Sequence, residues 1–300
     1  MRLASPFVGQ KAPGPKSGNQ KRWDHMSFSV NTNNGAMVAL QYLSATQGAL
    51  NQTQSAINSG MKVATARDDG AIYAIAQNQR GAVAGYASVI NSINNATSSV
   101  DVALSAGQSI SDLLIQLKAK ALAASDSSLD TASRQALNAN FTALRDQITT
   151  IVKNAVFNGF NLVDGSTNQI TALASADGSR RITTAAQNMK LSGTIVTMKS
   201  TSTISTQAKA SSLVATIQTS LTNVNAALAK LSSGAAKFSI QGTFVQKLSD
   251  TLTTGIGNLV DANMAEESAM LQSLQVKQQL GVQALSIANQ APQTILSLFR

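Results

Sequence analysis

The feature that most constrains this chain is a stretch near its start that carries no charged side chain. It runs from Ser27 to Met61. Its apolar positions recur at helical spacing, which indicates a helix with one apolar stripe. The stripe holds Ala39, Leu43, Leu50 and Ile57. The remaining positions are Gln, Asn, Ser and Thr rather than the Glu and Lys of an exposed helix. Because charge is costly to desolvate, the pattern predicts a helix over 33–58 that packs against other helices on most sides.

A second charge-free stretch, residues 278–299, lies at the other end of the chain. Two adjacent apolar stripes run through it and the residues before it. One stripe holds Leu271, Leu274, Leu285, Ala288 and Ile295, and the other holds Met270, Leu280, Ile287 and Leu298. A helix that is apolar on two faces needs more than one neighbour, so both ends are predicted to be buried in an assembly. We expect self-assembly to rest on Leu43, Leu50, Ile57, Leu271, Leu274, Leu285, Ile295 and Leu298.

Composition excludes several classes of site. The chain has no cysteine, which removes disulfides and thiolate metal ligands. Its only histidine is His25, and no nucleophile, base or His-Glu-x-x-His pattern accompanies it, so no catalytic residue, metal or cofactor is expected. No apolar run is long enough to insert into a membrane. Basic residues do not cluster with aromatic ones in the body of the chain, so nucleic acid is not an expected partner.

Residues 1–25 differ from the rest of the chain. They hold three of the four prolines, the only tryptophan, and five basic residues against one acidic residue. Two interpretations stay open: a disordered arm, or a non-native extension that precedes a true start at Met26. The segment lacks the apolar centre of a cleaved signal peptide.

Between the charge-free ends, apolar spacing predicts long helices over 71–124, 130–154 and 207–254. Asp68 or Asp69 is expected to cap the first of these helices. Gly255 and Gly257 are expected to break the last one, with a final helix from 262. These boundaries divide the chain into an N-terminal inner segment, long N-terminal helices, a β-rich insert, a long C-terminal helix and a C-terminal inner segment: 26–61, 62–156, 157–206, 207–258 and 259–300.

The insert differs from the helices in both pattern and composition. Apolar and polar residues alternate in Ile170–Leu173, and Asp177-Gly178 follows as a hairpin turn. The insert is rich in hydroxyl groups, and its outward face is expected to be O-glycosylated at one or more sites: Ser166, Thr167, Ser175, Ser179, Thr183 and Thr194.

The predicted fold is mainly α. It is a long antiparallel helical bundle or coiled coil formed by the N- and C-terminal segments, with a small β-rich insert. The two charge-free ends pair with each other, and so do the two long middle helices. The insert is expected at the far end of the bundle.

Three separated stretches of this chain resemble bacterial flagellins. The first holds VNTN at 30–33, NSGMKV at 58–63 and ARDD at 66–69. The second holds FNG at 157–159 and LVDG at 162–165. The third holds QQLG at 278–281, ANQAPQ at 288–293 and LSLFR at 296–300. The resemblance covers about residues 30–300 and is closest to compact flagellins that lack large outer domains.

The resemblance implies a structural subunit that polymerises into the flagellar filament, outside the bacterial cell, and serves swimming motility. Its end helices would line an inner tube and its long helices an outer tube. The partners it implies are further copies of the chain or other flagellins, an export chaperone, the type III export gate, and the cap and hook-junction proteins. Export would need no cleaved signal. Two alternatives stay open: a hook–filament junction protein with the same terminal helices, or another secreted coiled-coil protein.

We predict that deletion of residues 291–300 abolishes polymerisation while residues 71–254 stay folded. The reason is that the two-stripe helix loses apolar residues that only neighbouring copies can cover. Circular dichroism reports the fold, and sedimentation reports the polymer. Truncated protein that sediments as ordinary filaments would contradict this prediction.

Overall fold

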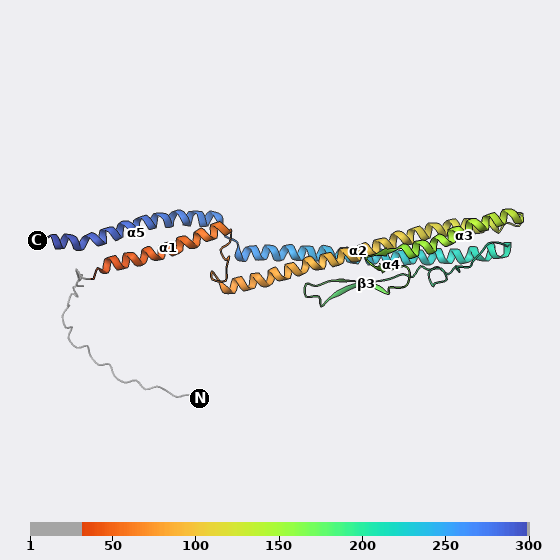
Figure 1. Cartoon of the computed structure of the whole chain (residues 1–300), viewed down its shortest axis with the longest axis horizontal. Helices are drawn as coiled ribbons and strands as arrows, with labels where there is room; N and C mark the ends of the chain where they lie inside the picture. The colour runs from red at the N-terminus through yellow and green to blue at the C-terminus, as the bar shows by residue number, and fades with distance from the viewer. Residues whose placement is uncertain (1–31, 299–300) are drawn as a thin grey trace, which may run out of the picture. The chain divides into compact units, whose positions relative to one another are not determined.

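The computed structural model describes the backbone of residues 32–298 and the side chains of 32–290. The alternatives for residues 1–25 therefore lie outside the described residues. The chain forms two compact units (Figure 1). One, the terminal unit, takes the described residues up to Asn58 and from Met264 onward. The other, the central unit, is Ser59–Asn263. Each unit is described by itself.

The terminal unit consists of two helices, α1 (Asn34–Ser59) and α5 (Met264–Leu298). They lie side by side and run in opposite directions (Figure 1). Asn33 near the start of α1 hydrogen-bonds Ala288 in the second half of α5, and Gln47 hydrogen-bonds Gln278. The predicted pairing of the two chain ends is thus present. Most side chains of both helices are nevertheless exposed.

The central unit is built on α2 (Gly70–Ala124), α3 (Thr131–Asn154) and α4 (Gln207–Val260). Helices α2 and α4 are antiparallel and pack through their apolar positions. Their register follows from two side-chain contacts, Ser111 with Asn225 and Lys118 with Gln218. The core holds fully buried side chains from all three helices: Ile110, Leu114, Leu117, Phe141, Ile148, Ile217, Leu231 and Phe238. This arrangement, together with the paired ends and small antiparallel sheets, confirms the predicted mainly α fold class.

The helices of the central unit begin at carboxylate and hydroxyl caps. Asp69 caps α2 by accepting hydrogen bonds from the backbone N–H groups of Ala71 and Ile72, at 2.9 and 3.0 Å. Asp68 instead accepts from Ala64 and Thr65 in the turn before the helix. Of the two expected caps, therefore, Asp69 serves α2. Side-chain acceptance of the first free N–H groups is the usual way in which a helix start is stabilised.

A buried arginine closes the turn between α2 and α3. The guanidinium of Arg134 donates to the carbonyl oxygens of Ala124, Asp126 and Leu129. Two of these, Ala124 and Asp126, are at or just beyond the end of α2, where carbonyl groups lack helical partners. The side chain lies almost fully inside the protein, yet its charge meets three backbone acceptors. Nothing in the sequence pattern separates this arginine from the exposed ones.

Two β-hairpins follow α3. Strands β1 (Val156–Phe157) and β2 (Phe160–Asn161) are joined by Asn158 and Gly159, both at positive φ, as a two-residue hairpin turn requires. Strands β3 (Gln169–Leu173) and β4 (Arg181–Ala185) pair antiparallel, with Ile170 opposite Thr184. The expected strand and the expected turn at Asp177-Gly178 are both confirmed, with Gly178 at φ 71°.

The position of the second hairpin differs from the prediction. The β3–β4 hairpin lies against the middle of α2 and α4, not at the far end of the bundle (Figure 1). Thr184 packs directly on Gly234 of α4, and Ala176 in the turn packs on Gly85 of α2. Any side chain at either glycine would collide with the hairpin, so the two glycines create its seat. The periodicity of apolar residues could not predict this packing, because the hairpin and the two glycines are far apart in the sequence.

The predicted helix break at residues 255–258 is wrong. Helix α4 continues through Gly255 and Gly257 to Val260. Ile256 and Val260 are buried there against Val63 and Ala76. The apolar contacts of one helix end outweigh the roughly 1 kcal/mol that a glycine costs inside a helix. The helix stops at Asp261, whose backbone is extended and bridges Met61.

We predict that Phe238→Ala and Phe244→Ala, two truncations six residues apart in α4, differ strongly in their effect on the stability of the soluble subunit. Phe238 is fully buried and Phe244 is 57% exposed. The first change should lower the free energy of unfolding by about 3–5 kcal/mol, because it leaves a cavity. The second should change it by less than about 0.5 kcal/mol. Urea titration followed by helical circular dichroism measures both, and equal losses would contradict this packing.

Candidate assembly surface

The apolar residues that were expected to mediate self-assembly lie mostly between α1 and α5 of one chain. Leu50 and Leu274 are buried there. Four others are half-buried: Leu43, Ile57, Leu271 and Leu285. The side chains of Ile295 and Leu298 lie outside the described residues. This placement shows what these residues do within one subunit, and their role between subunits stays a prediction.

Close approach of the two helices depends on a glycine and on amide contacts. A Cβ at Gly281 would lie 3.2 Å from a methyl carbon of Leu43, so the leucine packs on bare α5 backbone at this point. The side chain of Gln278 donates to that of Gln47 at 2.7 Å, and Asn33 donates to the carbonyl oxygen of Ala288 at 2.7 Å. These uncharged contacts replace the ion pairs that commonly join helices in water.

The second stripe of α5 faces away from α1. Val276, Leu280 and Ile287 are 55%, 57% and 68% exposed. At 100° per residue they fall on one side of the helix, nearly opposite Leu271, Leu274 and Leu285. The first three turns of α1 add further exposed apolar side chains: Met37, Val38, Leu40 and Tyr42. We call Val276, Leu280 and Ile287 the outward stripe.

The exposure of the outward stripe to water is energetically unfavourable, because its side chains are apolar. Burying one such side chain fully is worth about 1.5–3 kcal/mol, so three in a row are worth several kcal/mol per contact. Around Leu280 and Ile287, from Gln278 onward, there is no charge whose desolvation would offset that gain, and Lys277 next to Val276 is the one charge at the start of the stripe. The geometry therefore suits contact with another apolar surface.

The predicted glycosylation sites have different surroundings. The hydroxyl groups of Ser166 and Ser175 donate to the carboxylates of Asp164 and Asp177. Ser179 contributes its backbone N–H to Asp177 and lies beside the hydroxyl of Ser175. Thr183 is exposed on β4 and Thr194 is exposed in the following loop, whereas Thr167 is half-buried. Attachment of a sugar to Ser166 or Ser175 would remove a turn hydrogen bond.

Electrostatic shifts in the described residues come from turns and caps. Hydrogen bonds from Ser175 and Ser179 lower the pKa of Asp177 to about 2. A backbone hydrogen bond from Thr65 lowers the pKa of Asp68, and hydrogen bonds from Ser133 lower that of Asp130, the N-cap of α3. Each carboxylate is held ionised by local donors, which is a structural role.

Within residues 32–298, no three His, Asp or Glu side chains come together as metal ligands. The same part of the chain has no helix with the length and apolar content that crossing a membrane requires. The clearest functional surface in the described residues is therefore the apolar one.

Family comparison decides what this surface belongs to. Residues 30–168 match the bacterial flagellin N-terminal helical region, and residues 214–299 match the bacterial flagellin C-terminal helical region. This chain belongs to the bacterial flagellin family. It is a structural subunit of the flagellar filament, and nothing in the matches favours a hook–filament junction protein.

Curated relatives agree over nearly the full chain. Flagellin FljK of Caulobacter vibrioides is 51% identical over 272 residues, which are 91% of this flagellin and 98% of the relative. A flagellin of Brucella melitensis is 34% identical over 289 residues, covering 91% and 99% of the two chains. The crystal structure of Bacillus cereus flagellin covers 50% of this chain and 86% of its own, at 20% identity and a TM-score of 0.45. The family assignment rests on the sequence matches.

The expected assembly residues left out part of the surface that this flagellin exposes. Leu280 and Ile287 were recognised as a second stripe but were not assigned to assembly, and Val276 and Tyr42 were missed. Helical spacing alone reveals two stripes. Only the antiparallel pairing with α1 shows which of them remains outside. The sequence signal that could have assigned Leu280 and Ile287 to the assembly surface is the absence of charge around them.

We predict that the β3–β4 turn of this flagellin loosens as pH falls from about 4 to 2. The folded pKa of Asp177 lies below its ordinary value of 3.8, so its stabilising contribution is present above that value and disappears as the carboxylate takes up a proton near pH 2. Amide exchange protection at Ser179 and Arg180 should fall over this range, and less so in Asp177→Asn. A carboxyl pKa near 4 in an NMR titration would contradict the prediction.

Proposed function

We propose that this flagellin polymerises through the outward stripe of α5, together with the exposed apolar residues at the start of α1. The observation that carries the proposal is the exposure of Leu280 and Ile287 on a helix segment without charge. A filament contact would remove both side chains from water. The stripe Leu43, Leu50, Ile57, Leu271, Leu274 and Leu285 then holds the two helices of each subunit together, and Ile295 and Leu298 extend the contact toward the chain end.

The small number of buried side chains in the terminal unit supports this proposal. Leu50, Thr53, Ala56 and Leu274 are the few buried side chains that its two helices provide within the described residues. Helices gain most of their stability in proteins from tertiary packing, so an isolated pair with so little buried surface is weakly stable. Neighbouring copies would supply the missing contacts, and the helices would gain order as the filament grows. In that filament α1 and α5 form the inner tube, and the central unit forms the outer tube.

The remaining roles follow from membership in the family. We propose that the chain leaves the cell through the flagellar type III export gate, with help from an export chaperone and without a cleaved signal, and is added beneath a cap protein above the hook-junction proteins. Its role is structural rather than catalytic. Of the six candidate glycosylation sites, Thr183 and Thr194 are the best placed, because both are exposed and neither hydroxyl anchors a carboxylate in a turn.

We predict that Leu280→Lys raises the critical concentration for polymerisation about ten- to hundredfold. The change removes one buried apolar contact, worth about 1.5–3 kcal/mol, and each 1.4 kcal/mol is a factor of about ten. Gln275→Lys is the matched control, because Gln275 is exposed on α5 but lies off the outward stripe. Light scattering and pelleting over a concentration series measure both variants.

Circular dichroism should find the same helical content in both soluble variants, since both side chains are exposed in the subunit. If Gln275→Lys impairs polymerisation as strongly as Leu280→Lys, the outward stripe is not the contact. If neither change has an effect, assembly through this face of α5 is refuted.

A further inference from the structure

The charged residues of the central unit are distributed unevenly along the chain. Residues 62–177 hold eight basic and nine acidic side chains, whereas residues 178–249 hold eight basic side chains and no acidic one. The second range covers β4, the loop after it and most of α4. A range of this length without acidic residues gives its part of the surface a positive potential, which attracts anions.

Part of this range surrounds a hollow between β4 and α4, which we call the basic hollow. Its volume is about 410 Å³, within the usual range of ligand sites. Both of its lysines are exposed, and neither forms an ion pair within residues 32–290. The lining residues that carry polar side chains are Thr183, Thr184, Gln187, Lys230, Ser233 and Lys237.

The two lysines flank the middle of the basic hollow. Lys230 and Lys237 are separated by almost two full turns of α4, or about 10 Å along the helix, so they share one face. Gly234 lies between them, and Thr184 packs on its bare backbone. The basic hollow therefore has an ammonium group on either side of a threonine that rests on the helix.

Thr184 gives a second, independent indication of a ligand. The residue is only 6% exposed, and its hydroxyl oxygen has no hydrogen-bond partner in the described part of the chain. A buried hydroxyl without a partner is uncommon in a folded protein, because the hydrogen bonds it made to water are lost without replacement. At the wall of a hollow and between two lysines, this hydroxyl is placed to donate to an oxygen of a ligand.

We propose that the basic hollow binds an acidic polysaccharide, a sugar chain that carries carboxylate groups. Lys230 and Lys237 donate to successive carboxylates of the chain, in charge-assisted hydrogen bonds. The sugar between these carboxylates lies over Gly234 and accepts a hydrogen bond from Thr184. A lysine spacing of about 10 Å suits a polymer in which every second sugar is acidic, because a disaccharide has about that length.

The lining of the basic hollow favours a sugar chain over a nucleic acid. Single-stranded nucleic acids bind largely by stacking their bases on aromatic side chains, and none of the described residues that line this hollow is aromatic. The hydroxyl groups of Thr183 and Ser233 suit the hydroxyl groups of sugars instead. The choice of polymer rests on the role of this chain in the flagellum, where polysaccharides of outer surfaces are met. The site itself does not require polymerisation.

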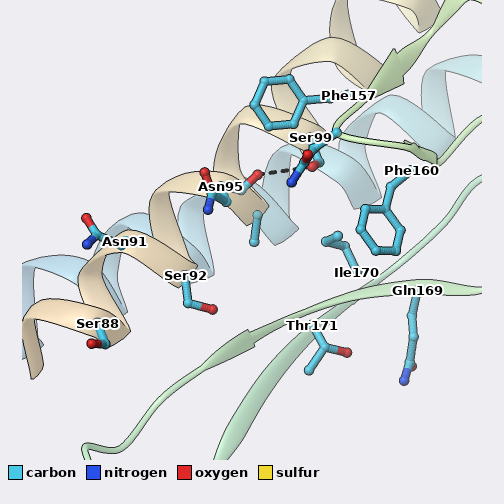
Figure 2. Close-up of a pocket in the computed structure, with 12 residues that line it drawn as sticks. Ser88, Asn91, Ser92, Asn95, Ser99, Phe157, Phe160, Gln169, Ile170 and Thr171 are labelled. Atoms are coloured by element: carbon cyan, nitrogen blue, oxygen red, sulfur yellow. Dashed lines mark hydrogen bonds between the residues drawn. The ribbon is translucent and has the colours of Figure 1, made fainter. Parts of the chain in front are cut away.

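A groove elsewhere on the central unit provides an internal comparison. It lies between α2 and β3, and uncharged side chains such as Ser92, Asn95 and Phe160 line it (Figure 2). Its volume of about 580 Å³ is larger than that of the basic hollow. Because it offers no charged donor to a carboxylate, an acidic polymer should prefer the basic hollow.

The test measures the affinity of the soluble, full-length chain for a fluorescent hyaluronate oligosaccharide, in which every second sugar carries a carboxylate. Fluorescence anisotropy at about 0.15 M salt is suitable, because attraction beyond about 8 Å is then screened. Lys230→Gln together with Lys237→Gln should weaken binding about tenfold, since two charge-assisted contacts are lost. The matched control is Lys209→Gln together with Lys247→Gln. It removes the same charge from exposed positions of α4 that lie at least about 15 Å along the helix from Lys230 and Lys237, and it should weaken binding less than about twofold.

Thr184→Val tests the hydroxyl between the two lysines. Valine has nearly the shape of threonine, and the hydroxyl has no partner within the described residues to lose, so the melting temperature should not fall. The affinity for the hyaluronate oligosaccharide should fall about three- to fivefold, which is the effect of one hydrogen bond. An unchanged affinity would overturn the site, because the polymer would then not contact Thr184.

Two further probes separate this site from general attraction to charge. A neutral dextran oligosaccharide should not bind measurably, and a single-stranded oligothymidylate should bind more weakly than the hyaluronate oligosaccharide. Residues 1–25 hold five basic residues in every variant, so they contribute equally to each affinity. Equal losses from the two lysine pairs would reduce the effect to net charge and overturn the basic hollow as a site.

Tighter binding of the oligothymidylate, with the same dependence on Lys230 and Lys237, would overturn the polysaccharide as the partner and assign the hollow to a nucleic acid. All of these affinities are measured on subunits that have not polymerised. Failure of the basic hollow is therefore distinguishable from failure of assembly through the outward stripe, which light scattering and pelleting report.

Discussion

The structure depends on apolar packing between two helices that are far apart in the sequence. The contact of α2 with α4 buries a continuous row of side chains from Val89 to Ala124 and from Ala210 to Val245. Each side chain adds only a few kcal/mol, but the row is long enough to hold two helices of more than fifty residues in one register. That register then sets the positions of α3 and both hairpins. Small residues such as Ala103 and Gly107, the latter directly under Leu228, keep the helices close, which explains why so few aromatic side chains are needed.

Much of this fold could be predicted because it is repetitive. Helical spacing of apolar residues determines α1, α2, α3 and the start of α4 to within a residue, and Asp69 and Asp177-Gly178 are local signals that act within a few positions. The errors arise where a distant contact overrides a local preference. Gly255 and Gly257 read as a break, yet Val63 and Ala76 cover the helix and extend it. The packing of the second hairpin on Gly85 and Gly234 could not be predicted from the sequence either, because a glycine in a helix gives no indication of which distant segment packs on it.

The candidate assembly surface could likewise be predicted only in part from the sequence. Lack of charge in α1 and in the second half of α5 indicates that both segments are buried in an assembly, and this inference needs no structure. Sorting their apolar residues into those that face the partner helix and those that face outward needs the antiparallel register, which contacts such as Gln47 with Gln278 supply. Arg134 was missed for a related reason: a buried guanidinium that binds three carbonyl groups looks like any other charged residue until the chain folds around it.

The glycine seats also affect how the central unit comes apart. Thr184 rests on one helix and Ala176 on the other, so the second hairpin is anchored to both long helices at once. A two-stranded hairpin alone is marginal in water, and here it cannot detach without exposing helix backbone at two separate points. We therefore expect the hairpin and the two long helices to unfold together when the central unit is heated, as one cooperative transition.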